Sequence, residues 1–206
     1  AFLASLWIFV NVSADACNFT LDPNTAHTGL TLSKKNRKVK RLRNPQPGEE
    51  PEDPDHPDRF EYCRQVLSVE GQTGRCYWEA EWKGKEVVIA MSYRGIKRKE
   101  RLSDDCLFGY NNQSWSLFYS SGKFLIKHNN LQTVIPAPRL PSNRVGVYLD
   151  YEELGSTESF PRTLTHLHTF HSTFTEPLYA GFRVYFGSST NSASSEPDNV
   201  GVILVY

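Results

Sequence analysis

The chain has 206 residues, of which 39% are hydrophobic, 13% aromatic and 22% charged. This length suits a single sandwich- or barrel-sized domain that buries a sizeable core. The formal net charge of +0 argues against a global attraction to nucleic acid or acidic membranes, so nucleic acid is not an expected partner. No apolar run reaches the roughly 18 residues that a membrane-spanning helix needs.

The first residues leave several interpretations open. Nine of residues 1–10 are apolar, and the small-residue sequence Ala14-Asp15-Ala16 resembles the end of a signal peptide. Asn11, Asn18 and Asn112 would be glycosylation acceptors in a secreted chain. However, no Met starts the run and no basic residue precedes it. We therefore expect residues 1–14 to be an apolar leader or linker, with a strand or a gene-model artefact as alternatives.

The four cysteines favour a reducing compartment. Cys17, Cys63, Cys76 and Cys106 are scattered and include no C-x-x-C pair. Disulfide frameworks concentrate in small secreted domains with regularly spaced cysteines. We therefore expect a cytoplasmic location, with secretion as the alternative, and no zinc site.

The first third of the chain predicts short strands and a long polar loop. Asp22-Pro23-Asn24 has the residue types of a tight turn, and the alternation at residues 30–33 predicts a short strand. Seven of residues 34–43 are basic, and six of residues 49–58 are acidic with prolines between them. Because proline donates no sheet hydrogen bond, we expect residues 44–59 to form an exposed loop. The basic run is then a solvated strand and loop rather than a nucleic-acid patch.

The segment Cys76–Trp82 alternates as a half-buried strand does. Trp78, Ala80 and Trp82 share one face, and each tryptophan needs a deep core because it buries roughly 150–250 Å². Tyr77, Glu79 and Glu81 share the other face. The two carboxylates predict that this second face is exposed to water, in an antiparallel sheet.

The remaining strands follow at short intervals. Residues 87–93 form a continuous apolar run that predicts a strand covered on both faces, and residues 115–119, 145–151 and 182–186 alternate. Turn signals recur about every ten residues and no segment has a convincing helical period. This pattern predicts an all-β sandwich. The Ser/Asn-rich stretch after Gly187 predicts a mobile tail over residues 188–206.

Five motifs in sequence order resemble those of the PRY-SPRY domain family. They are Leu21–His27, Pro54–Phe60, Gly74–Trp82, Val145–Glu152 and Leu167–Phe182. The resemblance covers about residues 15–187. It is closest to the fish versions found at the C-terminus of tripartite-motif ubiquitin ligases, NOD-like receptors and stonustoxin-type pore-forming subunits.

The resemblance implies a bent antiparallel β-sandwich of two sheets, the SPRY or concanavalin-like jelly roll. Residues 15–70 would form the PRY part and residues 71–187 the SPRY part. One departure concerns the hairpin that normally follows Tyr151-Glu152. Here residues 153–161 are shifted and end in Pro161, so we expect a short or irregular strand.

The resemblance also implies protein binding without catalysis, through variable loops at one end of the sandwich. By position these loops are residues 44–59, 94–105, 120–123, 128–133 and 152–162. Arginine and aromatic residues are common interface anchors. The predicted partner-binding residues are Tyr93, Arg94, Lys97, Arg98, Arg101, Asp104, Phe118, His128 and Asn129. Phe108 and Tyr110 also lie near loop edges, but core packing is at least as good an interpretation for both.

The expected partner is a protein, bound by an isolated domain that is itself monomeric. Any ubiquitin-transfer activity would reside in a RING domain elsewhere. The main alternative is the C-terminal domain of a pore-forming toxin acting at membranes, and a further one is a sugar-binding sandwich. Neighbouring domains of the full-length protein would discriminate a ligase, a receptor and a toxin.

Catalytic and metal-binding patterns are weak. His166, His168 and His171 form H-x-H-x-x-H, but no carboxylate or cysteine stands beside them in the sequence. The chain has no nucleophile elbow, P-loop or dinucleotide fingerprint. The paired carboxylates Glu79 and Glu81 are more simply a solvated face, and Asp104-Asp105 a turn. We therefore expect no enzyme activity, metal or cofactor.

Overall fold

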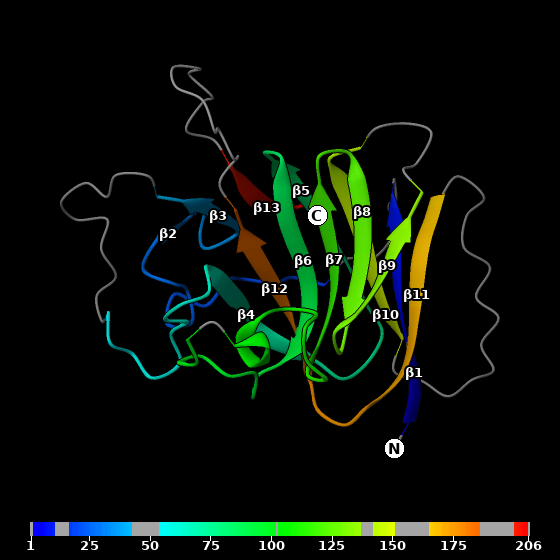
Figure 1. The fold of residues 1–206 in the computed structure, drawn as a ribbon, viewed down its shortest axis with the longest axis horizontal. Coiled ribbons are helices and arrows are strands. Elements are labelled where there is room, and N and C mark those ends of the chain that lie inside the picture. Colours follow the sequence, from blue (N-terminus) through cyan, green and yellow to red (C-terminus); the bar gives the residue numbers. More distant parts are fainter. Residues whose placement is uncertain are drawn as a thin grey trace.

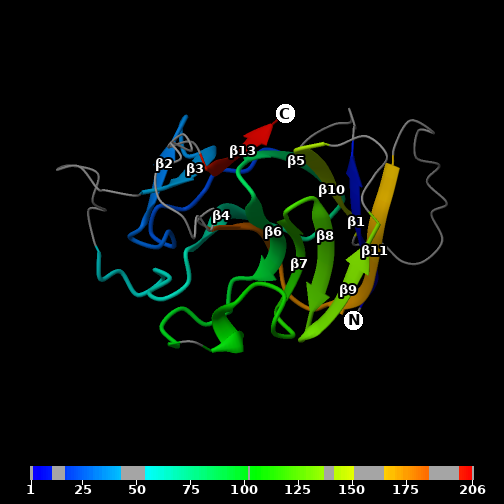
Figure 2. The same ribbon diagram turned by 45° about the horizontal axis from the view of Figure 1, so that its top comes forward.

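The computed structural model describes residues 2–10, 17–42, 54–101, 103–136, 142–150, 165–185 and 200–205. In these ranges the chain forms strands β1 to β13 and one short 3-10 helix, η1 (Asp104–Cys106). The strands build two antiparallel sheets packed face to face (Figures 1 and 2). The predicted all-β, two-sheet antiparallel sandwich is confirmed. No helix in the described ranges is long and apolar enough to cross a membrane.

The larger sheet has seven strands in the order β11-β1-β10-β5-β13-β3-β2. Their bounds are β1 (Phe2–Val10), β2 (Leu30–Ser33), β3 (Lys38–Arg41), β5 (Cys76–Lys83), β10 (Arg144–Asp150), β11 (Thr165–Phe174) and β13 (Gly201–Val205). The tryptophan-bearing strand β5 therefore lies in the middle of this sheet.

The smaller sheet has six strands in the order β4-β12-β6-β7-β8-β9. Their bounds are β4 (Gln65–Gln72), β6 (Glu86–Tyr93), β7 (Ser114–Ser120), β8 (Lys123–His128), β9 (Leu131–Ile135) and β12 (Leu178–Val184). Strand β6 is central and largely buried along its length, as its continuous apolar sequence predicts.

The main core lies between the sheets and is built around the two tryptophans of β5. Trp78 is 0% exposed and Trp82 is 1% exposed. The Trp78 ring packs edge-on against Phe19 and against Phe182, with both pairs of ring centroids 5.8 Å apart. The inward-facing Trp78 ring thus contacts residues from the early and late parts of the chain, Phe19 and Phe182.

A second, smaller cluster lies on the outer face of the six-stranded sheet. Successive residues of β6 point to opposite faces of the sheet. Ile89 and Met91 face the main core, whereas Val88 and Ala90 face the second cluster. The buried members of the second cluster are Phe60, Cys63, Leu67, Val88, Ala90, Ile96, Cys106 and Phe108. Five of these eight come from outside the strands, so the loops cover this sheet face.

One prediction for β5 is wrong. Tyr77 and Glu79 were expected to face water, but they are 5% and 4% exposed, and only Glu81 is exposed. The Tyr77 hydroxyl donates to Glu79 Oε1 at 2.6 Å, and Arg144 Nε pairs with Glu79 Oε2. The phenol lies over Gly146, where an added Cβ would clash. Hydrogen bonding and a neighbouring glycine thus allow a carboxylate to be buried.

Both ends of the chain contribute strands to the larger sheet. Of the alternatives for the apolar N-terminal run, the structure shows a strand: β1 lies antiparallel between β10 and β11, with Ser5 opposite Asp150 and His171. The predicted mobile tail is wrong for β13, which pairs with β5 and β3. Val202 and Leu204 are buried, and the short apolar run from Val202 to Val205 was the missed signal. The predicted irregular hairpin at 152–161 lies outside the described residues.

Candidate protein-interaction surface

The sheet register decides which predicted loops meet. Strand β6 pairs with β7 so that Ser92 lies opposite Ser114, and β7 pairs with β8 so that Trp115 lies opposite His128. The segment after Tyr93 and the turn after His128 therefore share one end of the sandwich, the lower end in Figure 1.

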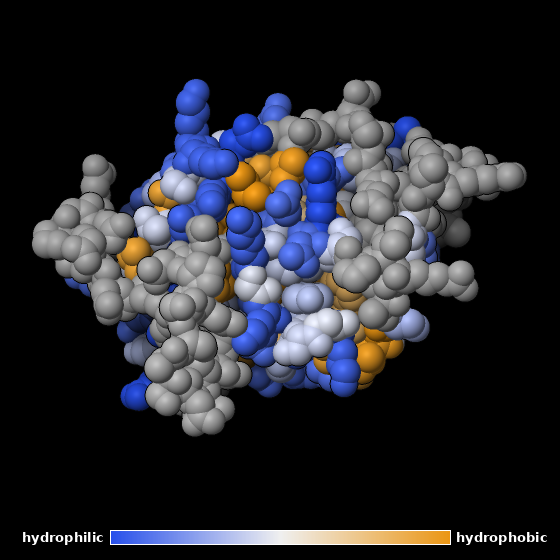
Figure 3. Space-filling view, turned by 90° about the horizontal axis from the view of Figure 1, so that it is seen from above, coloured by the Kyte–Doolittle hydropathy of each residue, from blue (hydrophilic) through white to orange (hydrophobic). Residues whose placement is uncertain are grey.

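The turn at Ser121–Gly122 lies at the other end, because successive hairpin turns in an antiparallel sheet alternate between ends. The expectation that residues 120–123 join the other loops is therefore wrong. Figure 3 looks down on that opposite end, where hydrophilic side chains surround small hydrophobic patches. This end provides natural control positions such as the exposed Lys123.

At the first end, residues 54–63 and the described residues of 94–111 pack together into what we call the loop platform. The Glu61 amide donates to the Arg98 carbonyl at 3.0 Å, and Lys99 Nζ donates to the His56 carbonyl at 3.1 Å. The Phe60 and Phe108 rings meet edge-on with centroids 5.8 Å apart. The platform therefore joins the predicted PRY and SPRY parts.

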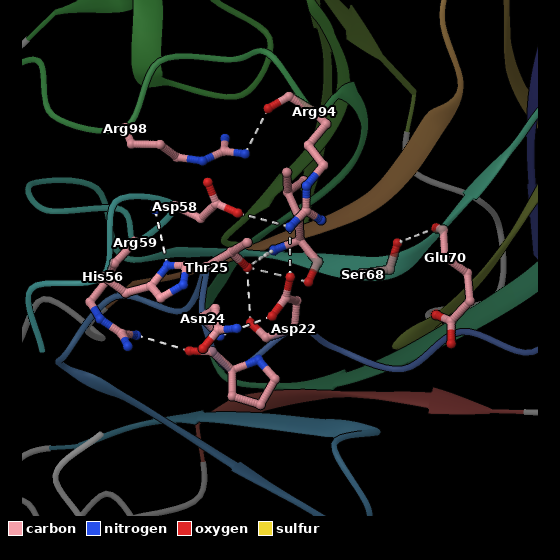
Figure 4. Close-up of polar contacts among 12 residues, drawn as sticks. Asp22, Asn24, Thr25, His56, Asp58, Arg59, Ser68, Glu70, Arg94 and Arg98 are labelled. Atoms are coloured by element: carbon pink, nitrogen blue, oxygen red, sulfur yellow. Dashed lines mark hydrogen bonds and ion pairs between the residues drawn. The ribbon is translucent and has the colours of Figure 1, made fainter. Parts of the chain in front are cut away.

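Arg94 ties the platform to the preceding turn. Its Nη2 atom lies 2.9 Å from Asp22 Oδ2 and 3.0 Å from Asp58 Oδ2, as Figure 4 shows. Partial burial opposes the charged form, but the hydrogen bonds to the two carboxylates outweigh it and raise the pKa of Arg94. The Asp22 side chain also accepts from the Asn24 amide at 2.9 Å, which confirms the predicted turn.

Arg98 holds the start of the platform's longer segment. Its guanidinium donates to the Ile96 carbonyl at 2.9 Å and to the Arg94 carbonyl at 2.7 Å. It also lies 4.4 Å from the Phe60 ring centroid, a cation–π contact. Burial lowers the pKa of Arg98 to about 10. The group stays protonated at neutral pH and uses its donors internally.

Two buried amide side chains fix the end of the same segment. Gln65, 0% exposed, donates from Nε2 to the Cys106 carbonyl at 2.7 Å and accepts from the Phe108 amide at 3.1 Å. Asn111 Nδ2 donates to the carbonyls of Asp104 and Leu107, each at 2.9 Å. The platform is thus held by specific polar contacts in addition to its apolar cluster.

The predicted partner-binding residues fall into three groups. Lys97, Arg101, Asp104 and Asn129 are exposed. Arg94 and Arg98 are half-buried and bonded within the platform. Tyr93, Phe118 and His128 pack against other side chains.

The packing contacts of this third group are specific. The Tyr93 hydroxyl accepts from the Thr175 amide at 3.0 Å. Phe118 meets Tyr185 with ring centroids 5.4 Å apart. His128 stacks on Trp115, with centroids 4.6 Å apart and an interplanar angle of 9°.

The exposed rim of the platform carries both signs of charge. Lys97 Nζ lies 3.0 Å from Asp105 and 3.7 Å from Glu100. Tyr62, which the sequence did not single out, is 43% exposed beside this rim. Its neighbour Phe60 ends one of the recognised motifs, but no pattern in the sequence marks which of the two aromatic rings faces outward.

The described residues contain no group of three side chains suited to a metal ion. His171 Nδ1 lies 3.2 Å from Ser5 Oγ, and His166 Nε2 lies 2.7 Å from Thr169 Oγ1. The His168 ring packs edge-on against Phe170 with centroids 4.7 Å apart, and burial lowers its pKa. Each histidine of the H-x-H-x-x-H pattern thus has a local structural contact.

Comparison with known proteins defines the class. Residues 19–72 match the family model of the PRY, or SPRY-associated, domain. With the two-sheet fold, this match confirms the resemblance to the PRY-SPRY domain family. The match begins at the buried Phe19 and ends with β4.

Relatives occur among toxins and tripartite-motif proteins. The chain is 40% identical to stonustoxin subunit beta of Synanceia horrida, covering 82% of this chain and 23% of that protein. It is 37% identical to tripartite motif-containing protein 16 of Mus musculus, covering 81% of this chain and 29% of that protein. The chain thus spans about a quarter of the length of these relatives.

Solved structures agree with the fold. A stonustoxin structure superposes with a TM-score of 0.69 and 32% identity, over 92% of this chain and 27% of that one. The TRIM65 PSpry domain superposes with a TM-score of 0.68 and 22% identity, over 96% of this chain and all of that one. The second likeness shows the shared fold alone.

Proposed function

We propose that this chain is a non-catalytic protein-interaction module whose recognition surface is the exposed rim of the loop platform. The observation that carries the proposal is the way the platform is held. Arg94, Arg98 and Gln65 use their polar groups internally, while Lys97 and Arg101 remain exposed. A rim fixed in this way binds at a lower cost in conformational entropy than a free loop does.

The proposed partner is a protein with an acidic or mixed-charge surface and a site for the Tyr62 ring. An interface of standard size buries roughly 800 Å² on each side, and the rim charges would act mainly on the association rate. The module would serve as the targeting domain of a tripartite-motif ligase or NOD-like receptor in the cytoplasm, and it would be monomeric in isolation.

The test uses a photo-crosslinking amino acid at position 101, with the same substitution at position 123 as the matched control. The proposal predicts that one protein from cell extract is crosslinked at position 101 and not at 123. Its binding to Lys97→Glu/Arg101→Glu should then fall about tenfold through a slower on-rate, while Lys123→Glu binds normally. Equal crosslinking at both positions, or unchanged binding by the double variant, would contradict the proposal.

A second candidate is a domain of a pore-forming toxin. The 40% identity to stonustoxin subunit beta favours it. The discriminating observation is the sequence of the full-length protein: a RING, B-box and coiled coil, or a NACHT domain, support the first proposal. A long pore-forming region supports the second.

A further inference from the structure

Cys63 and Cys106 lie against each other although 43 positions separate them in the sequence. Their Sγ atoms are 2.7 Å apart, and the two residues are 5% and 0% exposed. A disulfide bond measures about 2.05 Å, whereas heavy atoms in ordinary contact lie about 3.5–4.0 Å apart. The two sulfur atoms are therefore already closer than simple packing requires.

The polypeptide on each side of this pair is fixed. Gln65 accepts from the Phe108 amide and donates to the Cys106 carbonyl, while its own amide donates to the Cys63 carbonyl at 2.6 Å. The contact between the Phe60 and Phe108 rings also joins the segment that contains Cys63 to the segment that contains Cys106. A bond between the sulfur atoms would therefore join backbones that are already in place.

We propose that Cys63 and Cys106 form a reversible disulfide by exchange with a small-molecule disulfide such as oxidised glutathione. This bond would be a covalent modification site that ties the PRY segment to the loop platform. All four cysteines are free thiols in the structure, as their scattered spacing predicts, and the spacing gave no sign that Cys63 and Cys106 are neighbours. The proposal does not depend on which partner the platform binds.

Cys106 starts the exchange. The hydrogen bond from Cys63, assisted by Arg183, outweighs burial and lowers the pKa of the Cys106 thiol to about 7. The same hydrogen bond, together with burial, raises the pKa of the Cys63 thiol. Near neutral pH the thiolate, which is the reactive form, is therefore carried by Cys106.

The exchange then proceeds in two displacements. The Cys106 thiolate attacks one sulfur of oxidised glutathione, whose S–S bond breaks and releases one glutathione thiolate. Cys63 then loses its proton and attacks Cys106 Sγ, which expels the second glutathione. The two protein thiols lose two electrons, oxidised glutathione gains them, and both protons end on glutathione.

Access to Cys106 requires the platform to open, because this residue is fully buried. The Glu100 carbonyl lies 3.4 Å from Cys106 Sγ, and Lys99, Glu100 and Arg101 are exposed, so opening this segment uncovers little of the main core. After the bond forms, the same opening is opposed by a covalent link. Oxidation would therefore hold the platform closed.

The other two cysteines provide an internal control. Burial and a hydrogen bond with Cys17 raise the pKa of Cys76, so these two thiols are also neighbours. The Cys17 amide donates to the Tyr77 carbonyl at 2.7 Å, which places this pair at the larger sheet. Neither residue is a member of the loop platform.

The experiment incubates the reduced chain in an oxidised glutathione buffer that fully oxidises a thioredoxin control. Free thiols are then alkylated, and the chain is digested without reduction for mass spectrometry. We expect a linked peptide pair containing Cys63 and Cys106 that lacks two hydrogen atoms, and amide exchange in residues 97–101 at least several-fold slower than in the reduced chain. Cys17→Ser should retain this linked pair, whereas Cys63→Ser and Cys106→Ser should each lose it.

Full alkylation of Cys63 and Cys106 after the same incubation would overturn the proposal. So would linked peptides that join either residue to Cys17 or Cys76. If a serine variant does not fold, the peptide map of the unsubstituted chain decides alone.

Discussion

The two faces of the six-stranded sheet are covered in different ways. On the inner face, strands from distant parts of the chain meet Trp78 and Trp82 in a core made almost wholly of alternating strand residues. On the outer face, Phe60, Ile96 and Phe108 reach the sheet from loops. The packing on the inner face is stabilised by a large buried apolar area. The packing on the outer face depends on a small apolar cluster and a few polar contacts around it. The scaffold and the proposed recognition surface therefore differ in how they are stabilised.

The largest expected effect is on the inner face. Trp78→Ala should lower the free energy of unfolding by about 4 kcal/mol, because it leaves a cavity between Phe19 and Phe182. Urea denaturation followed by circular dichroism measures this loss. Glu81→Ala, at an exposed position of the same strand, is the matched control. A loss below about 1 kcal/mol would mean that the indole is not central to the core.

Gly181→Ala tests the outer face. A Cβ at position 181 would lie 2.7 Å from Phe108 Cζ and 3.2 Å from Leu67 Cδ2, so Phe108 must move away from the sheet. We expect a loss of about 2 kcal/mol from overpacking, measured by the same denaturation. Gly74→Ala, where an added Cβ meets no atom within 4 Å, is the control. Unchanged stability in Gly181→Ala would show that the Phe108 contact is not rigid.

Arg94→Ala tests whether the loop platform and the main core are stabilised separately. It removes the contacts to Asp22 and Asp58 and should cost about 1 kcal/mol, after a discount because the side chain is 36% exposed. Amide exchange should accelerate in the platform and stay unchanged in β5 and β6. Equal acceleration in both regions would contradict separate stabilisation. Because Arg94 and Arg98 hold the platform, their substitution tests its structure, and Lys97 and Arg101 are the better binding probes.

An effect about as small as that of Arg94→Ala is expected for the pH dependence of stability at His27. Burial, with a further contribution from Arg64, lowers the pKa of His27 to about 4, and its Nδ1 accepts from the Gly29 amide at 2.8 Å. Between pH 6.5 and 4 the unfolded chain binds a proton that the folded chain does not, so stability falls as pH falls through this window. We expect this histidine to account for about 1 kcal/mol after a discount for its partial exposure.

His27→Asn, which keeps an acceptor near the Nδ1 position, should reduce the slope of unfolding free energy against pH in that window. A slope equal to that of the unsubstituted chain would show that His27 titrates normally in the folded state.

The main core was predictable because it follows from local alternation. The Trp78 and Trp82 face, the continuous strand β6 and the all-β class were all evident from residue spacing. The burial of Glu79 was not, because its partner Arg144 comes from a strand 65 positions away. Strand β13 was missed because a short apolar run next to a Ser/Asn-rich segment carries little signal.

The platform was predictable only in part. The motifs indicated which loops are relevant, and charge indicated Lys97 and Arg101. The roles of Arg94 and Gln65 depend on a carboxylate and a carbonyl 72 and 41 positions away in the sequence, which no local pattern encodes. Arg98 bonds to carbonyls only two and four positions before it, but no residue pattern marks that conformation. The Cys63–Cys106 pair was hidden for the same reason.

The most direct test of this account is hydrogen exchange followed residue by residue in the unsubstituted chain. We predict that the Ile89 amide exchanges only through global unfolding. The amides of Glu61 and Phe108, which donate to the Arg98 carbonyl and to Gln65 Oε1, should be protected but open at a lower free energy. Exchange of Glu61 and Phe108 at unprotected rates would show that the platform is a free loop and would contradict the account.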